Sequence, residues 1–456
     1  MLFFVFIFLL LIFFVFGRCG APIKVFSITW LICVSPITLG AIRYNNFSKE
    51  ELLFELVLIG LFSCFTLGVI FHNAFRKKLV AQLPAPTLPE RATVTSWTKF
   101  AWLCGISGTL FLSIDFFQRG GAGLNDMVQL RDSYVGNTQV SNFARISSVL
   151  TWGCLYSYSY ALFYQSGLSK RNFYICLLPV IGYFLVALFS GGRQAAMQIL
   201  LFTFLIFFAK KSIDLHRLKN IKIVDTSRKN IFFPLFICAL MIIYMGYVAV
   251  ARNDHSISLD KGEVLSRLFD FTLSPNFEWL LSQMPSGLQN STIEALVYFT
   301  SPLPLFSRFL ELDIVNATYG AMSLPFIMRQ IEPITGISVL GALNDKIAMM
   351  ASQGVIGVGW TTAISGYLQD FGFFWSCIFL FFQGLYTSWA WWQLRRGVSF
   401  HSFLIALILL TAVIYMPLIS IFSETNILLL WSYCFVALYF GRNKMPIRKS
   451  NSLSVK

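Results

Sequence analysis

Residues 51–78, ELLFELVLIGLFSCFTLGVIFHNAFRKK, place a long apolar run directly before three basic residues. A helix needs roughly 17–25 apolar residues to cross the hydrocarbon core of a bilayer, and the segment 52–72 meets that length. Arg76, Lys77 and Lys78 follow it, and basic residues mark the cytoplasmic end of a span. This stretch predicts a membrane-spanning helix that leaves the bilayer on the cytoplasmic side.

The same apolar pattern recurs along the whole chain of 456 residues, of which 56% are hydrophobic and 12% charged. This composition predicts an all-α polytopic membrane protein with about 11 transmembrane helices. We expect these spans at 2–17, 25–42, 52–72, 100–117, 146–166, 173–190, 194–209, 231–251, 372–393, 402–422 and 426–441. The first is short and resembles a signal-peptide core. It lacks a basic leading region and a clear small-residue cleavage site, so we interpret it as an uncleaved span.

The basic residues predict the orientation of the chain. If the spans alternate, the loops on one side carry 23 Lys and Arg against three acidic residues, and the rest of the chain carries 12 against 18. The positive-inside rule then places the N-terminus outside and the C-terminus in the cytoplasm. The net charge of +14 is mostly this bias, which favours contact with membrane lipid and predicts no nucleic-acid partner.

These spans divide the chain into four parts. Spans one to eight occupy 1–251, a long extracytoplasmic loop occupies 252–371, spans nine to eleven occupy 372–441, and a basic tail occupies 442–456. The stretch from Arg252 to Asp370 holds 11 of the 21 acidic residues and no cysteine, so no disulfide framework is expected there. Two apolar pieces within it, 293–310 and 347–367, are broken by Pro or Gly. They predict interfacial or re-entrant segments, or amphipathic helices lying on the bilayer.

Arginines on the outer side are the clearest candidates for a binding site, because positive charge is scarce there and each arginine needs a reason. Arg193 ends the turn Ser190-Gly191-Gly192-Arg193, where a helix N-terminus and two glycines favour an anion. The other candidates for substrate binding are Arg131, Arg145, Arg252, Arg267 and Arg308. Guanidinium groups pair bidentately with phosphate oxygens, so such a cluster favours a lipid-linked pyrophosphate. Headgroup contacts or ion pairs with nearby acids are the alternative for each of them.

Carboxylates in or beside the long loop are candidates for a general base. Asp370 lies in Gly366-Tyr367-Leu368-Gln369-Asp370-Phe371-Gly372, which leads into span nine. We expect it at a helix N-terminus, where it caps free amides or acts as the base. Asp254 and Glu294 are the other candidates. No metal site is predicted. Glu311 and Asp313 have a spacing that suits a divalent cation, but a solvated acidic turn explains it better.

The order of these elements resembles the Wzy-type oligosaccharide repeat-unit polymerases, which include O-antigen and enterobacterial common antigen polymerases. Four features carry the resemblance: a glycine-rich second outer loop with Arg131, the turn 190–193, Arg252 before a long outer loop, and the Gly-Tyr-x-x-Asp-Phe-Gly element at 366–372. The pattern extends over essentially the whole chain. One departure is Trp375, which stands where family members often have a second glycine.

This resemblance implies a GT-C-like membrane glycosyltransferase on the outer face of the bacterial cytoplasmic (inner) membrane. Donor and acceptor would both be oligosaccharide repeat units linked to undecaprenyl pyrophosphate, with no cofactor, and a chain-length-regulating co-polymerase as a possible partner. The arginines at 131, 193 and 252 match the positions where the family places basic residues near the donor. Two alternatives stay open. An O-antigen ligase is expected to carry a histidine in its large outer loop near a glycine-patterned segment, and His255 lies too far upstream of 354–359. A flippase or other transporter is expected to bury charges mid-span, where only Glu55 and Asp115 are candidates.

Overall fold

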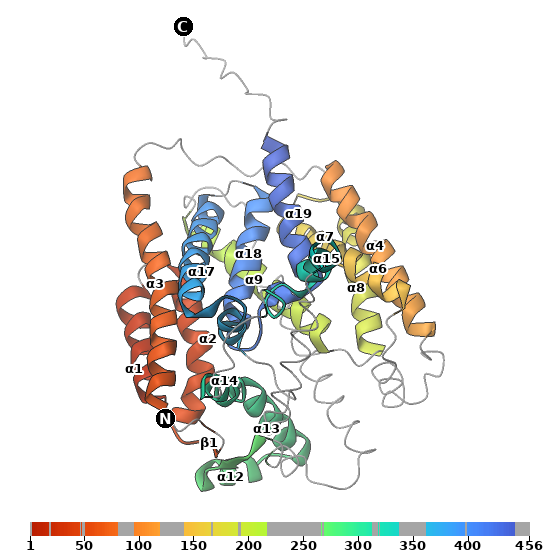
Figure 1. The fold of residues 1–456 in the computed structure, drawn as a ribbon. Coiled ribbons are helices and arrows are strands. Elements are labelled where there is room, and N and C mark those ends of the chain that lie inside the picture. Colours follow the sequence, from red (N-terminus) through yellow and green to blue (C-terminus); the bar gives the residue numbers. More distant parts are fainter. Residues whose placement is uncertain are drawn as a thin grey trace.

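The structure is a computed structural model that describes residues 2–17, 20–45, 47, 51–80, 95–118, 141–165, 167–189, 193–216, 266, 269–311, 318, 320–336, 362–396 and 399–442. Within these ranges the chain is nearly all helical (Figure 1). The helices are α1 (Phe3–Leu11) with a π-helical extension (Ile12–Phe16), α2 (Ala21–Thr38), α3 (Glu51–Val80), α4 (Ser96–Phe116), α6 (Asn142–Leu150), α7 (Trp152–Phe163), α8 (Lys170–Phe189), α9 (Arg193–His216), α12 (Pro275–Ser282), α13 (Ser286–Thr300), α14 (Pro302–Glu311), α15 (Pro325–Thr335), α17 (Ala363–Arg396), α18 (Phe400–Tyr415) and α19 (Thr425–Arg442).

Five helices of the described part are long and apolar enough to cross a membrane: Ala21–Thr38, Glu51–Arg76, Ser96–Phe116, Lys170–Ala187 and Ala363–Leu394. Four shorter apolar helices accompany them, at Phe3–Phe16, Ala195–Lys210, Phe400–Tyr415 and Thr425–Phe440. The predicted fold class is confirmed at this level, as a mostly helical protein with helices long and apolar enough to span a membrane. The number of about 11 spans and the GT-C-like arrangement stay predictions, and the predicted span 231–251 lies outside the described residues.

Two predicted spans end earlier than expected. The apolar run at 402–422 is helical only to Tyr415, because Pro417 has no amide to continue the hydrogen-bond ladder. The run at 25–42 is helical only to Thr38, and Ile42 belongs to a strand. The predicted span 146–166 is also built differently, from α6 and α7 with a junction at Thr151.

The described residues include one two-stranded antiparallel sheet, which was not expected of an all-α protein. Strand β1 (Ile42–Tyr44) pairs with β2 (Phe271–Leu273), with Arg43 opposite Thr272. Asn45 donates to the Asp270 carboxylate at 2.9 Å beside it. The ribbon ties the turn after α2 to the segment 269–311, although more than 200 residues separate them in sequence.

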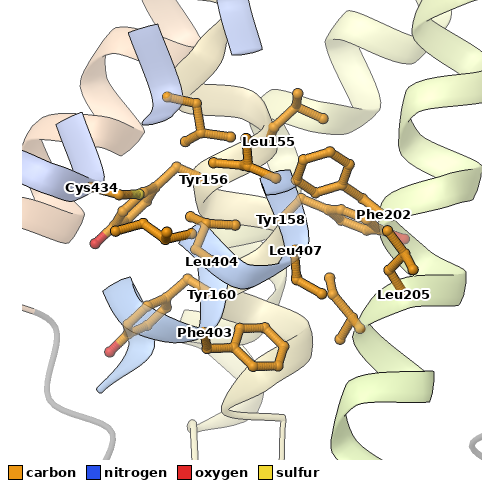
Figure 2. Close-up of a cluster of buried hydrophobic side chains, with 14 of the residues drawn as sticks. Leu155, Tyr156, Tyr158, Tyr160, Phe202, Leu205, Phe403, Leu404, Leu407 and Cys434 are labelled. Carbon is orange, nitrogen blue, oxygen red and sulfur yellow. The ribbon is translucent and has the colours of Figure 1, made fainter. Parts of the chain in front are cut away.

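The described residues form two hydrophobic cores. One is built by α4, α7, α8, α9, α18 and α19, and the other by α1, α2, α3, α13, α14 and the first part of α17. In the first core α7 is buried from Trp152 to Leu162, and Figure 2 shows Tyr156, Tyr158 and Tyr160 projecting from it among leucine and phenylalanine side chains of neighbouring helices. A helix that is enclosed on every side belongs at the centre of a bundle.

Peripheral helices expose large apolar side chains instead. Phe14 is 72% exposed, Phe374 68% and Trp375 62%. Apolar exposure of this extent suits contact with lipid. Trp375, the departure from the glycine of the family pattern, therefore stands on an outer surface and crowds no neighbouring helix.

Glycines bring the helix axes together at two contacts. A Cβ on Gly384 of α17 would lie 2.1 Å from the Phe65 carbonyl oxygen of α3, and a Cβ on Gly153 of α7 would lie 2.1 Å from the Ala101 carbonyl oxygen of α4. Small residues at such contacts let helix backbones approach closely, which is a common basis of helix association in membranes.

Candidate functional site: a polar layer at one end of the bundle

Several segments that are far apart in sequence meet at one end of the bundle, the end where α12, α13 and α14 lie in Figure 1. The Ala363 amide donates to the Met416 carbonyl oxygen at 2.9 Å, joining the start of α17 to the end of α18. The Ser420 hydroxyl donates to the Ser323 carbonyl oxygen at 3.5 Å. The segments around Ser323 and Ala363 were predicted to lie in the long outer loop, and Met416 and Ser420 were predicted to lie at the outer end of the span 402–422.

The ribbon is fixed to the same end by a buried tyrosine. The Tyr44 hydroxyl and the Thr300 hydroxyl of α13 form a hydrogen bond of 2.6 Å. Burial raises the pKa of Tyr44, and the hydrogen bond with Thr300 opposes that effect in part. The phenol therefore remains neutral and links the turn after α2 to the long outer segment.

A break at Gly372 shapes this end of α17. Its φ of 70° and ψ of 176° are non-helical and divide the element into a half-helix before it and a long helix after it. This combination of angles is accessible essentially only to glycine. The half-helix is enclosed, since every residue from Thr362 to Asp370 is buried. The expectation that Asp370 lies at a helix N-terminus is wrong: it lies near the end of the half-helix, because the break at Gly372 comes after it.

Asp370 holds the segment 318–323 against this half-helix. One carboxylate oxygen accepts hydrogen bonds from the Thr318 hydroxyl at 2.6 Å and the Met322 amide at 3.1 Å. The other oxygen accepts from the Ser323 amide at 2.8 Å. The side chain does cap free amides, as expected of it, but those of a distant segment. With 6% of its surface exposed and both oxygens engaged, it acts as an anchor in this structure.

Two further polar side chains at this place are buried with no hydrogen-bond partner among the described residues. They are the Gln369 amide, which is 2% exposed, and the Ser323 hydroxyl. Leaving a buried polar group unpaired costs about 1–3 kcal/mol, so such groups need a specific explanation. They mark the surroundings of Asp370 as more polar than packing requires.

A second polar group surrounds Glu424, in the short connection between α18 and α19. Glu424 is partly exposed and lies close enough to Tyr183 of α8 and Tyr415 of α18 to act on both electrostatically. Two residues further on, the Asn426 side chain donates to the Gln198 side chain of α9 at 3.0 Å. This contact joins α19 to the first turns of the helix that begins at Arg193.

The predicted site residues fall in different parts of the structure. Arg193 is the first residue of α9, as the anion-site expectation requires. Arg145 is exposed on the amphipathic helix α6, whereas Arg308 is partly buried on α14. Glu294 is partly buried on α13, one turn from Tyr298. The remaining candidates, Arg131, Arg252, Arg267 and Asp254, lie outside the described residues.

Sequence reasoning passed over Glu424 because it looked for acids in the long loop. Two signals stood in the sequence: Pro417 interrupts the apolar run of span ten, and Ser423-Glu424-Thr425-Asn426 has the composition of a helix start. Together they place a carboxylate at the end of the bundle where the outer segments meet.

Other buried charged groups bind helix ends. A Glu55 oxygen accepts from the Phe4 amide in the first turn of α1 at 3.0 Å. Asp115 accepts from the hydroxyl of Ser141, the residue that caps α6. The Lys210 ammonium donates to the Leu162 carbonyl oxygen near the end of α7. Glu55 and Lys210 form hydrogen bonds with backbone groups near helix ends, and Asp115 holds the serine that caps one.

Among known proteins, neither a family model, nor a curated protein, nor a solved structure matches this chain. The class that the fold defines is that of a helical protein with several helices long and apolar enough to span a membrane.

Proposed function

We propose that this protein is a polysaccharide polymerase of the Wzy type. It would join oligosaccharide repeat units carried on undecaprenyl pyrophosphate at the outer face of the bacterial cytoplasmic membrane. The observation that carries the proposal is the convergence of the 366–372 element, the 318–323 segment and the 416–424 connection into one polar layer at one end of the helices. A membrane enzyme whose polar substrates are carried on lipids needs polar groups at the membrane surface, where those substrates lie.

The chemistry follows from the two substrates. A hydroxyl of the acceptor sugar attacks the anomeric carbon of the donor glycan, and the lipid pyrophosphate leaves. Arginines at the outer side stabilise the negative charge that develops on the pyrophosphate. Arg193 supports this role best among the described residues, because it begins a helix of 24 residues whose free amides also favour an anion.

The two buried mid-span charges give little support to a transporter. Glu55 and Asp115, the two candidates for a charged path, are each engaged in holding a helix start. A transport path needs ionisable groups that face a cavity or each other within the membrane. The polymerase and the ligase, which both work at the membrane surface, are favoured by this arrangement over a flippase.

Arg193→Ala tests the proposal in a bacterium that makes a suitable lipid-linked repeat unit and lacks its own polymerase. We expect the wild-type protein to produce a ladder of long glycans on gels, and Arg193→Ala, expressed at the same level, to leave single repeat units. Arg171→Ala is the matched control, since Arg171 lies at the opposite end of α8. A ladder of wild-type length from Arg193→Ala contradicts the assignment of that turn to the donor.

The same gels separate the alternatives. Loss of a ligase leaves no glycan attached to its final acceptor, whereas loss of a polymerase leaves one unit attached. Loss of a flippase keeps the repeat units on the cytoplasmic face, where an impermeant sugar oxidant added outside the cell does not reach them.

A further inference from the structure

A cleft opens between α4 and α8, close to the start of both helices. Its wall consists of Thr98, Lys99 and Trp102 from α4 and Asn172, Ile175 and Cys176 from α8. Its volume is about 120 Å³, which is less than the roughly 300–1,000 Å³ of pockets that enclose a whole small molecule. The cleft therefore suits one part of a larger ligand.

A hydrogen bond that depends on Pro179 fixes the indole ring in this wall. The Trp102 indole N–H donates to the Ile175 carbonyl oxygen of α8 at 2.8 Å. In a regular α-helix that oxygen would accept from the amide of residue 179, but a proline has no amide hydrogen. The indole thus satisfies a carbonyl group that α8 leaves free. This matters most in lipid, where no water replaces the missing donor.

Both helices begin at the same end of the bundle. Trp102 contacts Ile175, and further along α4 the Thr109 hydroxyl donates to the Pro179 carbonyl oxygen at 3.1 Å. Because these contacts follow the same order along both helices, α4 and α8 run in the same direction. Lys170 and the segment before α4 belong to loops that the basic residues predict to be cytoplasmic. The cleft therefore lies at the predicted cytoplasmic ends of two helices that are long and apolar enough to span a membrane.

The surface around the cleft suits lipid. Ile175 lines the cleft and is itself exposed, and so are Tyr174 and Leu178 on the same helix. On α4, Leu103 directly follows Trp102 and is also exposed. Large apolar side chains exposed on a membrane-spanning helix contact acyl chains, and tryptophan is common at the depth of the headgroups. A phospholipid can thus enter the cleft directly from the membrane.

Lys99 gives the cleft a positive charge. Its side chain is exposed, and no described residue forms an ion pair or hydrogen bond with its ammonium group. A lysine stem packs on apolar surface while its ammonium reaches the headgroups, and basic pockets between helices on the cytoplasmic side bind anionic headgroups. Asn172 is partly exposed in the same cleft and carries an amide that can donate to a phosphate oxygen. A cation and a neutral donor beside an apolar wall match a phosphate that is attached to an acyl chain.

We propose that the cleft between α4 and α8 binds one anionic phospholipid. The phosphate lies at Lys99 and Asn172, and the upper part of an acyl chain lies against Trp102 and Ile175. By the predicted topology this site is at the end of the bundle opposite to the candidate functional site, and it does not depend on the proposed polymerase function. A lipid bound there holds the cytoplasmic ends of α4 and α8 together.

A general attraction of basic residues to anionic lipid makes a different prediction. Every lysine near an anionic membrane surface gains a similar interaction with it. Lys170 provides the comparison, because it is also exposed and begins α8. At about 100° per residue it lies about 200° around the helix from Asn172, away from the cleft. A specific site distinguishes Lys99 from Lys170, whereas a surface attraction does not.

The experiment uses the full chain in vesicles of phosphatidylcholine that contain a small fraction of photoreactive phosphatidylglycerol, with the reactive group at the top of the acyl chain. Adducts are mapped by mass spectrometry after irradiation, and we expect them to concentrate on Trp102 and Ile175. Lys99→Gln should lower the yield of these adducts about fivefold, the factor that corresponds to the usual contribution of one lysine near an anionic surface. Lys170→Gln is the matched control and should stay within about twofold of the wild type.

Asn172→Phe tests the cleft itself, because the ring fills the space and leaves both lysines unchanged. We expect it to remove most adducts at Trp102 and Ile175. Thermal unfolding of every variant verifies that the fold is retained, which is expected because Lys99 and Lys170 are exposed and Asn172 is partly exposed.

Several results would overturn the proposal. Equal losses of adduct in Lys99→Gln and Lys170→Gln show that the charges act only through the membrane surface. Labelling of the cleft by photoreactive phosphatidylcholine as strong as that by phosphatidylglycerol, or a wild-type yield from Asn172→Phe, contradicts a selective site. Adducts spread evenly along α4 and α8 indicate ordinary lipid contact, and unlabelled Trp102 and Ile175 indicate that another part of the chain fills the cleft.

Discussion

Adding one methyl group at Gly384 tests how closely α3 and α17 are packed. These two helices make the most extensive helix–helix contact of the described residues. In Gly384→Ala the new Cβ would lie 2.1 Å from the Phe65 carbonyl oxygen and 3.0 Å from the Phe65 carbonyl carbon. Close carbon–oxygen contacts across helices are normally about 3.3 Å or longer, so the backbones must separate by about 1 Å. No side-chain rotation relieves the clash, because the contacted atoms are backbone.

Two opposing effects set the magnitude. Overpacking of this kind costs about 1–3 kcal/mol, and a clash with backbone belongs at the upper end. Alanine is favoured over glycine in a helix interior by about 1 kcal/mol. We expect Gly384→Ala to lose about 2 kcal/mol of unfolding free energy, measured by denaturation in detergent micelles.

Gly60 provides the matched control on α3. A Cβ there meets only the Phe373 ring, at the ordinary distance of 3.6 Å, so Gly60→Ala should be neutral or slightly stabilising. Gly68 forms the reciprocal contact, with a Cβ 2.0 Å from the Phe381 carbonyl oxygen. The costs of Gly68→Ala and Gly384→Ala should sum to more than the cost of the double variant, since one separation of the helices relieves both clashes. Equal stability of Gly384→Ala and Gly60→Ala would refute the close packing.

Three further substitutions probe the local geometry. Gly372→Ala should lower the free energy of unfolding by roughly 1–3 kcal/mol, because only glycine fits its backbone angles. In Gly366→Ala the new Cβ meets no atom closer than 3.6 Å, so this control should be tolerated. Thermal unfolding of the two variants compares them directly. Glu55→Ala should lower the free energy of unfolding by about 1–3 kcal/mol, because it leaves an amide of α1 without a hydrogen bond. Glu55→Gln should recover most of that stability, because its side-chain oxygen still accepts the hydrogen bond. Equal losses of stability in both variants would contradict the hydrogen bond. Tyr44→Phe should cost about 1 kcal/mol and increase proteolytic cleavage within 269–311, and an unchanged cleavage rate would argue against the tyrosine as a tether.

The sequence predicted the helices well and their ends poorly. Apolar runs identify spans because a helix is the element that satisfies its own backbone in lipid, so length and hydropathy alone indicate it. Helix ends depend on single residues: Pro417 ends α18 within the apolar run that was predicted as span ten. The structure breaks α17 at Gly372, where span nine was predicted to begin, but the buried half-helix before the break was not predicted, since its burial comes from segments elsewhere in the chain.

The site shows the same division between local and long-range information. The motif at 366–372 singled out Asp370 as a candidate site residue. Its hydrogen bonds with Thr318 and Ser323 were found only in the structure. The ribbon of β1 and β2 consists of three-residue strands, Ile-Arg-Tyr and Phe-Thr-Leu, which are too short to show a period. Glu424 was missed because candidates for a general base were sought only in or beside the long loop.

The buried charges of this bundle explain why its chemistry is expected at one end. In lipid each unsatisfied backbone group costs several kcal/mol, and helix ends carry such groups even when the helix interior is saturated. Glu55, Asp115 and Lys210 are each committed to a helix end, and Asp370 to the amides of a neighbouring segment. A group whose bonding capacity is used in this way is a poor proton carrier, because moving its proton breaks the fold that it supports. We therefore expect the chemistry at the end of the bundle where the outer segments meet, beside the first turns of the helix that begins at Arg193.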